Sequence, residues 1–213
     1  YDGDSEDMQM GGIANCWRTL SELNKTADNR AHIGLVPLAL GKADIFIDRK
    51  ECKRTSSAKL NEEIFEPVIK PSQISHFMYL NELPQTDFIS KVEGVKTADL
   101  CAGKEPDYAL LDLFDIIFVS SDEHDAEKIR KSCHSMVIEH SPTGSSFGHS
   151  GHVLLDYKMP EEYHVENANV LGAGDMFASC ILFALHNGWK FDVALEFAHT
   201  TTAGLIRKYN EKI

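Results

Sequence analysis

No CxxC pair occurs among the five cysteines of this chain, which are dispersed over its 213 residues as Cys16, Cys52, Cys101, Cys133 and Cys180. An odd, scattered set of cysteines does not suit a disulfide framework and is typical of reduced thiols in a cytoplasm. We therefore expect a cytoplasmic protein in which most of these side chains act as small buried hydrophobes.

Long apolar runs and an excess of basic residues are also missing. No apolar run is long enough to cross a bilayer, and the first residues, YDGDSEDM, reverse the basic and then apolar order of a signal peptide. Only 21 Lys and Arg stand against 33 Asp and Glu, which gives a formal net charge of −12. Such a charge repels phosphate backbones and anionic lipid, so we expect neither a nucleic-acid nor a membrane partner.

The middle of the chain alternates strand-like and helix-like segments. With 43% hydrophobic residues the chain can bury one core, and we treat residues 1–213 as a single domain. Alternation of this kind predicts βαβ units and a parallel sheet. The strand-like segments are ISHFMYL (74–80), VKTADL (95–100), DIIFVS (115–120) and HSMVIEH (134–140), and the helix-like segments are TDFISKV (86–92), DYALLDLF (107–114) and DEHDAEKIRKSC (122–133).

The flanking segments have clear periodicities of their own. A helix is predicted directly after Gly11-Gly12, in IANCWRTLSEL, and ADIFID (43–48) is predicted to pair with SSAKL (56–60) across the charged turn RKECKR. Later in the chain, SSFGH and HVLLDY flank a Ser150-Gly151 turn and predict a hairpin. The two longest helical patterns cover residues 173–187 and 191–208.

The segment NVLGAGDMF (169–177) carries the strongest chemical signal, because it lies between strand-like YHVEN and a helical run. Gly172, Ala173 and Gly174 leave backbone N–H groups uncovered at a helix start, where the helix dipole favours an anion. Asp175 at the same place is suited to accept a proton from a substrate hydroxyl. Together these residues suit phosphoryl transfer. The alternative is an ordinary helix N-cap, for which aspartate is also a favoured residue.

Two stretches resemble the signatures of the ribokinase-like (PfkB) carbohydrate kinases. NVLGAGDMFASCILFAL resembles the pattern D-T-x-G-A-G-D-x-F, and GGIANCWRTLSEL resembles the glycine pair, asparagine and helix of the earlier signature. The spacing is nearest to heptose-phosphate kinase domains, and FDIIFVSSDE is also similar to ketohexokinase. The resemblance covers about Gly11 to Lys208. It implies an α/β, ribokinase-like three-layer fold with a mainly parallel central sheet flanked by helices and a small β lid, roughly within residues 41–62.

The resemblance also implies a role for individual residues. Asp175 is the expected catalytic base for a sugar hydroxyl, with Gly172, Ala173 and Gly174 as the anion hole. The residues expected to contact the sugar are Gly11, Gly12 and Asn15, for which a helix start with a buried polar residue is the alternative interpretation.

The same resemblance implies ATP and Mg²⁺ as cofactors. Ser120 stands at the family's usual asparagine, and Glu123 at the glutamate that organises Mg²⁺ through water, although a solvated first-turn acid is an equal interpretation. The remaining nucleotide-binding candidates are Ser141, Gly144, His199, Thr202 and Ala203. For His199 the alternative is a helix-face histidine with no ligand role.

The sequence departs from the family pattern in several places. Asn169 and Val170 replace the usual aspartate and threonine beside the glycine loop, the first strand has no counterpart before Gly11, and the chain is shorter than typical members. The expected function is an ATP-dependent phosphotransferase acting on a small sugar, with a possible homodimer through the lid. A non-catalytic pseudokinase of the same fold and a nucleoside kinase remain as alternatives.

Three histidines lie close together in sequence around the predicted hairpin: His140, His149 and His152. No further ligand at a recognised spacing completes a metal site with them. We therefore expect solvent-exposed hairpin histidines.

Overall fold

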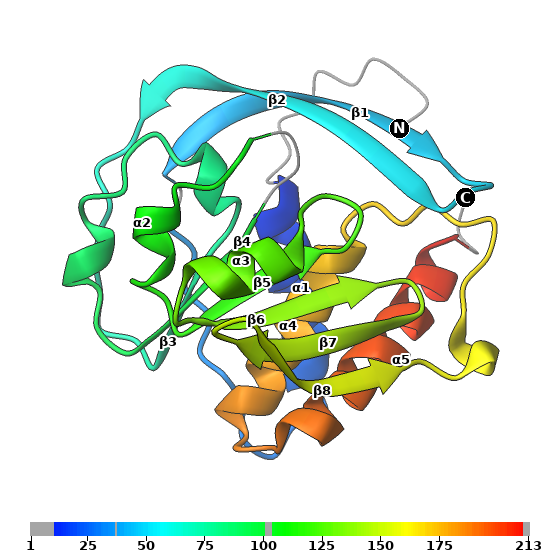
Figure 1. Cartoon of the computed structure of the whole chain (residues 1–213). Helices are drawn as coiled ribbons and strands as arrows, with labels where there is room; N and C mark the ends of the chain where they lie inside the picture. Colours follow the sequence, from blue (N-terminus) through cyan, green and yellow to red (C-terminus); the bar gives the residue numbers. More distant parts are fainter. Residues whose placement is uncertain (1–10, 37, 101–103, 211–213) are drawn as a thin grey trace.

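The computed structural model describes residues 11–36, 38–100 and 104–210, which form two sheets and the helices around them (Figure 1). The helices are α1 (Gly11–Asn24), α2 (Tyr108–Leu111), α3 (Ala126–Ser132), α4 (Ala173–His186) and α5 (Phe191–Asn210). Short 3₁₀ helices are η1 (Leu80–Glu82), η2 (Ile89–Lys91) and η3 (Glu161–Tyr163). The strands are β1 (Ala39–Asp48), β2 (Lys53–Ile64), β3 (Ile74–Phe77), β4 (Val95–Asp99), β5 (Ile116–Ser120), β6 (Met136–Ser141), β7 (Gly144–His149) and β8 (His152–Lys158).

The main sheet has the strand order β3-β4-β5-β6-β7-β8. Strands β3 to β6 are parallel, and β7 and β8 continue the sheet antiparallel. This confirms the parallel strands predicted between residues 74 and 140 and the hairpin predicted around Ser150-Gly151. Because the carboxyl ends of parallel strands meet at one edge of a sheet, the residues that end β3 to β6 lie along a common edge.

Alternate residues of the central strands supply two separate cores. Ile117 and Val119 of β5 pack with α2 and with Ile129 of α3, whereas Ile116 and Phe118 point to the other face and pack with α4 and α5. Successive side chains of a strand point to opposite faces, so one run of four apolar residues, 116–119, serves both sides of the sheet. The result is three layers, with α2 and α3 on one face and α4 and α5 on the other.

Helix α4 is the most deeply buried of the helices. Residues 175–184 are all buried, because α4 is covered by α1 and α5 as well as by the sheet. A helix that is apolar on every side is typical of such a central position. Asp175 is the only charged residue in this buried stretch, which makes it the most unusual residue of the helix.

Strands β1 and β2 form a separate antiparallel sheet joined by the turn at residues 49–52. This confirms the pairing predicted for residues 43–48 and 56–60, although both strands extend beyond those segments. Figure 1 shows the ribbon arching over the side of the molecule at which α1 and α4 begin. The Cys52 thiol lies 3.6 Å from the carbonyl oxygen of Val165 and packs near Ala168, which fixes the turn against the segment before α4.

Two predicted elements are wrong for identifiable reasons. Residues 86–92 form only a turn and η2 instead of a helix, since Gly94, at φ 83°, turns the chain into β4 three residues after η2. Residues 163–167 form no strand. The Arg207 guanidinium of α5 donates hydrogen bonds to the carbonyl oxygens of Glu162 and His164, at 2.8 and 3.0 Å, so a helix side chain satisfies this backbone in place of a sheet.

Two boundaries also differ from the sequence prediction. The strand predicted over residues 74–80 ends at Phe77, because Tyr79 adopts a left-handed conformation with φ 57°. Helix α1 begins at Gly11 and therefore includes the glycine pair, which was expected to precede it.

The described cysteines are free thiols, and Cys16, Cys133 and Cys180 are buried as predicted, whereas Cys101 lies outside the described residues. Burial raises the pKa of Cys180 to about 12, so this thiol stays protonated and apolar in character. In the ranges that the structure describes, no helix combines the length and apolar character needed to cross a membrane.

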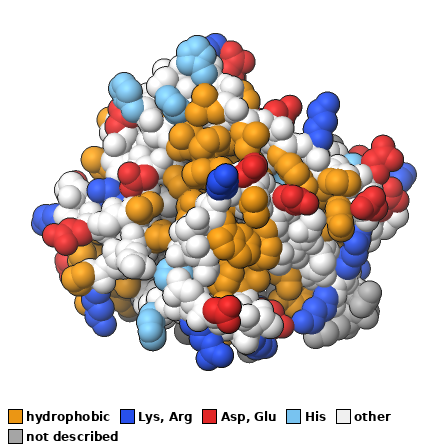
Figure 2. All heavy atoms as spheres, turned by 90° about the horizontal axis from the view of Figure 1, so that it is seen from below, with side chains coloured by type: hydrophobic (Ala, Val, Ile, Leu, Met, Phe, Trp, Pro, Cys, Tyr) orange, Lys and Arg blue, Asp and Glu red, His pale blue; other side chains and the backbone are white. Residues whose placement is uncertain are grey.

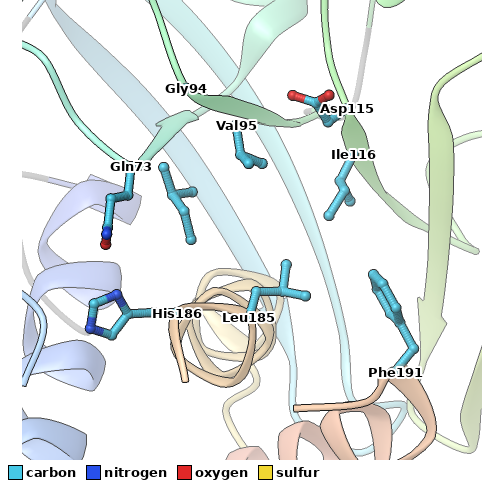
Figure 3. Close-up of a pocket in the computed structure, with 9 residues that line it drawn as sticks. Gln73, Gly94, Val95, Asp115, Ile116, Leu185, His186 and Phe191 are labelled. Carbon is cyan, nitrogen blue, oxygen red and sulfur yellow. The ribbon is translucent and has the colours of Figure 1, made fainter. Parts of the chain in front are cut away.

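An apolar groove of about 660 Å³ lies at the end of α4 opposite to Asp175. Figure 2 shows apolar side chains gathered on this face, which is turned away from the β1–β2 ribbon. In Figure 3 Leu185 and Phe191 face Ile116 and Val95 across the groove, at the amino ends of the strands. The groove is therefore separate from the edge at which the strands end.

We predict that stability falls as the pH drops below about 6.5, in part because of His76 on β3. Its Nδ1 lies 2.8 Å from the Thr97 hydroxyl oxygen, its Nε2 is buried without a partner among the described residues, and burial lowers its pKa to about 4. An unfolded histidine takes up a proton near pH 6.5, so between pH 6.5 and 4 the unfolded state binds more protons than the folded state. Stability is complete above this window and is lost as the pH falls through it.

Urea denaturation at several pH values tests this prediction. Between pH 6.5 and 4, each such histidine adds up to about 1.4 kcal/mol per pH unit to the slope of the unfolding free energy against pH. This slope corresponds to the uptake of one proton on unfolding. His76→Leu should lower the slope by up to this amount. His152→Leu, at an exposed position, serves as the control and should leave the slope unchanged. An identical slope in wild type and His76→Leu would contradict the prediction.

Candidate functional site

Asp175 lies in the first turn of α4 but does not cap it. The N-cap residue is Gly172, with φ 80° and no side-chain cap, and the Asp175 side chain is buried three positions later. The interpretation of Asp175 as an ordinary N-cap is therefore wrong. A carboxylate in the first helical turn is stabilised by the helix dipole. Because Asp175 is not the N-cap residue, its side chain is available for contacts outside the helix.

Side chains from two other elements converge on the Asp175 carboxylate. The Asn15 amide of α1 donates a hydrogen bond to Oδ2 at 2.9 Å, and the Tyr79 hydroxyl donates to Oδ1 at 3.4 Å. A carboxylate held from both sides has a fixed orientation and is not free to rotate. The three residues lie 64 to 160 positions apart in pairs along the chain, and the fold brings them to one place.

The close approach of α1 to the start of α4 requires a glycine on each side, Gly12 in α1 and the N-cap residue Gly172. A Cβ on Gly172 would lie 2.3 Å from Nδ2 of Asn15, and a Cβ on Gly12 would lie 2.1 Å from the Tyr79 hydroxyl oxygen and 2.8 Å from Oδ1 of Asp175. Gly172 also adopts a left-handed φ, which glycine tolerates best. Gly12 and Asn15, both predicted to contact a sugar, thus border Asp175, whereas Gly11 opens α1 at an exposed position.

A row of polar residues crosses the sheet beside this cluster. Ser120 of β5 is paired with His140 of β6, His140 with Ser145 of β7, and Ser145 with Tyr157 of β8. Paired residues point to the same face, and the rings of His140 and Tyr157 contact residues of α4 and α5. The row therefore faces the same side of the sheet as α4, with Asp99 on β4 continuing the carboxyl edge.

Asp99 and Asp175 both affect the Cys16 thiol. Burial, and then the negative charge of Asp175 and of Asp99, raise the pKa of Cys16 well above its ordinary value. Its Sγ lies 3.4 Å from the Asp175 carbonyl oxygen and 3.4 Å from the Met78 sulfur. A thiol held neutral in this way is a packing residue and not a nucleophile.

The predicted Mg²⁺-organising residue lies in the turn after β5. The Glu123 backbone N–H donates to the Ser120 carbonyl oxygen at 3.1 Å, and the Ser120 hydroxyl donates to the Asp122 carboxylate. Among the described residues no three His, Cys, Asp or Glu side chains gather into a metal-binding group. Asp122 and Glu123 thus offer oxygen atoms without forming an all-protein metal cage.

The predicted nucleotide turn joins β6 to β7. The Ser141 hydroxyl donates to the Gly144 carbonyl oxygen at 3.0 Å and accepts a hydrogen bond from the Thr143 N–H at 3.2 Å. This closes a tight turn at the carboxyl end of β6. The structure places Ser141 and Gly144 next to His140, and their role in nucleotide binding stays a prediction.

The three candidates on α5 are buried. His199, Thr202 and Ala203 all lie on the inner side of the helix. The His199 ring stacks on Tyr157, with centroids 5.3 Å apart and planes at 21°, and contacts Phe177 at 4.9 Å. Its Nε2 and the Thr202 hydroxyl have no hydrogen-bond partner among the described residues. Burial, and then the neighbouring His140, lower the pKa of His199 to about 4, so its ring is neutral.

One of the three hairpin histidines is not where the sequence places it. His152 is exposed and His149 lies at the end of β7, but His140 is half-buried against Phe177, with ring centroids 5.0 Å apart. The expectation of three exposed hairpin histidines is therefore wrong for His140. Its position on the strand HSMVIEH, in alternation with the buried Ile138, was the signal that it shares the inner face of the sheet.

Asn169, which departs from the family pattern, has a structural role. Its N–H donates to the Asn210 side-chain oxygen at 2.7 Å, and the Asn210 amide donates back to the Asn169 carbonyl oxygen at 3.1 Å. The Asn169 side chain accepts a hydrogen bond from the Leu171 N–H at 2.9 Å. The glycine loop is thus fixed to the end of α5.

Comparison with known proteins finds similar structures but no similar sequence. No protein-family model matches the sequence, and no curated protein matches it significantly. Among solved structures, ribokinase from Thermotoga maritima aligns with a TM-score of 0.61 at 15% identity, over 97% of this chain and 84% of that one. Apo adenosine kinase from Trypanosoma brucei brucei aligns with a TM-score of 0.59 at 16% identity, over 92% of this chain and 81% of that one.

A pyrophosphate-dependent kinase in the ribokinase family aligns with a TM-score of 0.51 at 15% identity, over 70% of this chain. The chain spans 64% of the length of that kinase, which is less than two thirds. At sequence identities this low, these structural alignments establish the fold alone. The chain has the ribokinase-like α/β fold, in which a mainly parallel central sheet is flanked by helices, and this confirms at the level of fold the resemblance carried by the two signatures.

We predict that Gly172→Ala destabilises the protein more than Gly188→Ala does. Both glycines have a left-handed φ, of 80° and 70°, so each substitution carries a similar backbone cost of roughly 1–2 kcal/mol. A Cβ on Gly188 meets nothing within 4 Å, whereas one on Gly172 displaces the Asn15 amide from Asp175. Loss of a partner to a buried carboxylate adds about 1–3 kcal/mol.

Denaturant unfolding of the two variants measures the difference. The free energy of unfolding should fall by at least about 1 kcal/mol more for Gly172→Ala than for Gly188→Ala. Equal losses would show that Asn15 is not held between the two helices in the way described.

Proposed function

We propose that the protein is a kinase that transfers a phosphoryl group to a hydroxyl of a small sugar or sugar derivative. The observation that carries this proposal is the buried Asp175 carboxylate, held by Asn15 and Tyr79 in the first turn of α4 behind the loop Gly172–Gly174. A base beside an anion-binding helix start is the arrangement that phosphoryl transfer to a hydroxyl needs. The ribokinase-like fold supports the same class of reaction.

Asp175 acts as the base in this proposal. The acceptor hydroxyl gives its proton to the carboxylate while its oxygen forms a bond to the γ-phosphorus of the donor. The bond between that phosphorus and the bridging oxygen breaks, and ADP leaves. Asn15 and Tyr79 hold the carboxylate in place for this proton transfer, and Gly12, which has no Cβ, makes room for the Tyr79 hydroxyl and for Oδ1.

The glycine loop stabilises the charge on the transferring group. The N–H of Ala173 donates to the Val170 carbonyl oxygen and that of Met176 to Gly172, which leaves Gly174 and Asp175 as the other first-turn amides. First-turn amides have no acceptor within their own helix. Together with the helix dipole they suit the oxygens of a phosphoryl group.

ATP is the proposed donor, with its phosphates between the α4 start and the turn that contains Ser141 and Gly144. Mg²⁺ prefers oxygen ligands and keeps several waters, so the oxygens of Asp122 and Glu123 fit an ion held largely by phosphates and water. When bound, it would neutralise phosphate charge. His199, Thr202 and Ala203 remain the proposed neighbours of the adenine ring of ATP.

The β1–β2 ribbon is the proposed lid over the acceptor. It arches over the side at which α1 and α4 begin, where Gly12, Asn15 and Asp175 converge (Figure 1). The similarity to an adenosine kinase is nearly as high as that to a ribokinase. The acceptor panel in any assay therefore needs nucleosides as well as sugars.

We predict that Asp175→Asn keeps the fold and lowers kcat by roughly two to four orders of magnitude, the usual contribution of a positioned general base. Asparagine has nearly the same shape as aspartate but does not accept a proton. The assay measures phosphorylation of sugars and nucleosides by ATP, with far-UV circular dichroism and thermal unfolding as checks of folding.

Asp125→Asn is the matched control. Asp125 caps α3 by accepting a hydrogen bond from the Lys128 N–H at 3.0 Å, and asparagine caps a helix about as well. Its turnover should equal that of the wild type. Equal turnover in Asp175→Asn would remove the catalytic role, and a folded wild type that binds ATP without turnover on any acceptor would favour a pseudokinase.

A further inference from the structure

The imidazole of His140 lies directly in front of the glycine loop. A Cβ on Gly174 would lie 3.2 Å from Cε1 and 3.6 Å from Nε2 of His140. Gly174 has no left-handed φ, so a side chain here would be crowded by the ring and not strained by its backbone conformation. An edge of the ring therefore lies against Gly174, a residue of the proposed anion hole.

The neighbours of His140 hold the ring in this position. Its partners across the sheet, Ser120 and Ser145, are small and leave room for the ring on the inner face. Phe177, one turn after the loop on α4, contacts the ring at 5.0 Å with planes 35° apart. The imidazole is thus fixed by packing and does not depend on a ligand to order it.

The chemistry of the site favours a hydrogen-bond donor at this place. A ring N–H beside first-turn amides adds a donor to the same anion, and such bonds to charged groups are stronger than neutral ones. His199 lies next to His140 on the α5 side, and burial lowers its pKa to about 4, so its ring is neutral. The other titratable groups on this side are Asp175 of α4, Tyr157 of β8 and Asp99 of β4.

We propose that His140 is a phosphate-binding residue that contacts the transferred phosphoryl group or the neighbouring phosphate of the donor. This rests on the proposed function, because it assumes that the anion at the glycine loop is a phosphoryl donor. His140 forms no covalent bond with it. The ring donates a hydrogen bond to a phosphate oxygen on the side opposite to the loop amides.

The test compares His140→Leu with His140→Gln. Leucine fills similar space without a donor, whereas the glutamine amide retains an N–H near the position of Nε2. His140→Leu should lower kcat/KM for ATP by roughly 10- to 100-fold, as expected for a hydrogen bond to a charged group, and His140→Gln should recover a substantial part of it. The KM for the acceptor should stay within about two-fold, because His140 borders the loop and not Gly12 or Asn15.

His152→Leu is the control, since this histidine is exposed at the turn between β7 and β8. Calorimetric binding of ATP and of inorganic pyrophosphate, without acceptor, gives a readout that needs no turnover. Both probes should bind the His140→Leu variant more weakly than the wild type, and His152→Leu should match the wild type.

The outcomes separate this inference from the proposed function. Wild-type turnover together with unchanged kinetics and binding in folded His140→Leu would overturn the inference and leave the kinase proposal intact. A second outcome is a wild type that binds both probes but shows no turnover, together with a His140→Leu variant that binds them more weakly. This result would support the phosphate contact and contradict the kinase proposal. A wild type that binds neither probe would overturn both.

Discussion

The arrangement of the candidate site depends on the close contact between the first turns of α1 and α4. Burying a carboxylate is unfavourable unless it is hydrogen-bonded, and Asp175 meets this requirement through Asn15 of α1 and Tyr79 after β3. Neither partner reaches it unless Gly12 and Gly172 lack side chains. The glycines, the amide and the carboxylate therefore form one unit, in which each residue is needed because of the others.

The sheet contributes the second half of the site through the alternation of its side chains. On the face toward α4, the interior positions of β5 and β6 are apolar, as in Phe118 and Ile138, but the terminal positions are Ser120 and His140. The same face therefore changes from a packed core to a polar surface within one residue pair. This change coincides with the first turn of α4, so the core holds the helix in place and its beginning stays available for a ligand.

Much of this fold follows from local patterns, and the failures have physical causes. The parallel strands and both long helices were predicted because their periodicity is decided by burial on one or both faces. The strand predicted over residues 163–167 is wrong, since an arginine of α5 takes the place of a neighbouring strand there. At the site, the glycine loop and Asp175 were visible as a motif. Tyr79 was not, because a left-handed conformation at a tyrosine has no sequence signal. His140 was misplaced because it was grouped with the hairpin histidines, although it ends the predicted strand HSMVIEH.

Under the proposed function, a chain of net charge −12 has to bind a polyphosphate against an unfavourable overall field. The proposed donors at the candidate site are groups whose positive charge is local: the first-turn amides of α4 and the His140 imidazole. Such groups act over a short distance and are effective where water is excluded. They therefore require a ligand to enter the site fully before it is held, which gives a covering element such as the β1–β2 ribbon a direct part in affinity. Under the proposed function, recognition thus depends on enclosure rather than on long-range attraction.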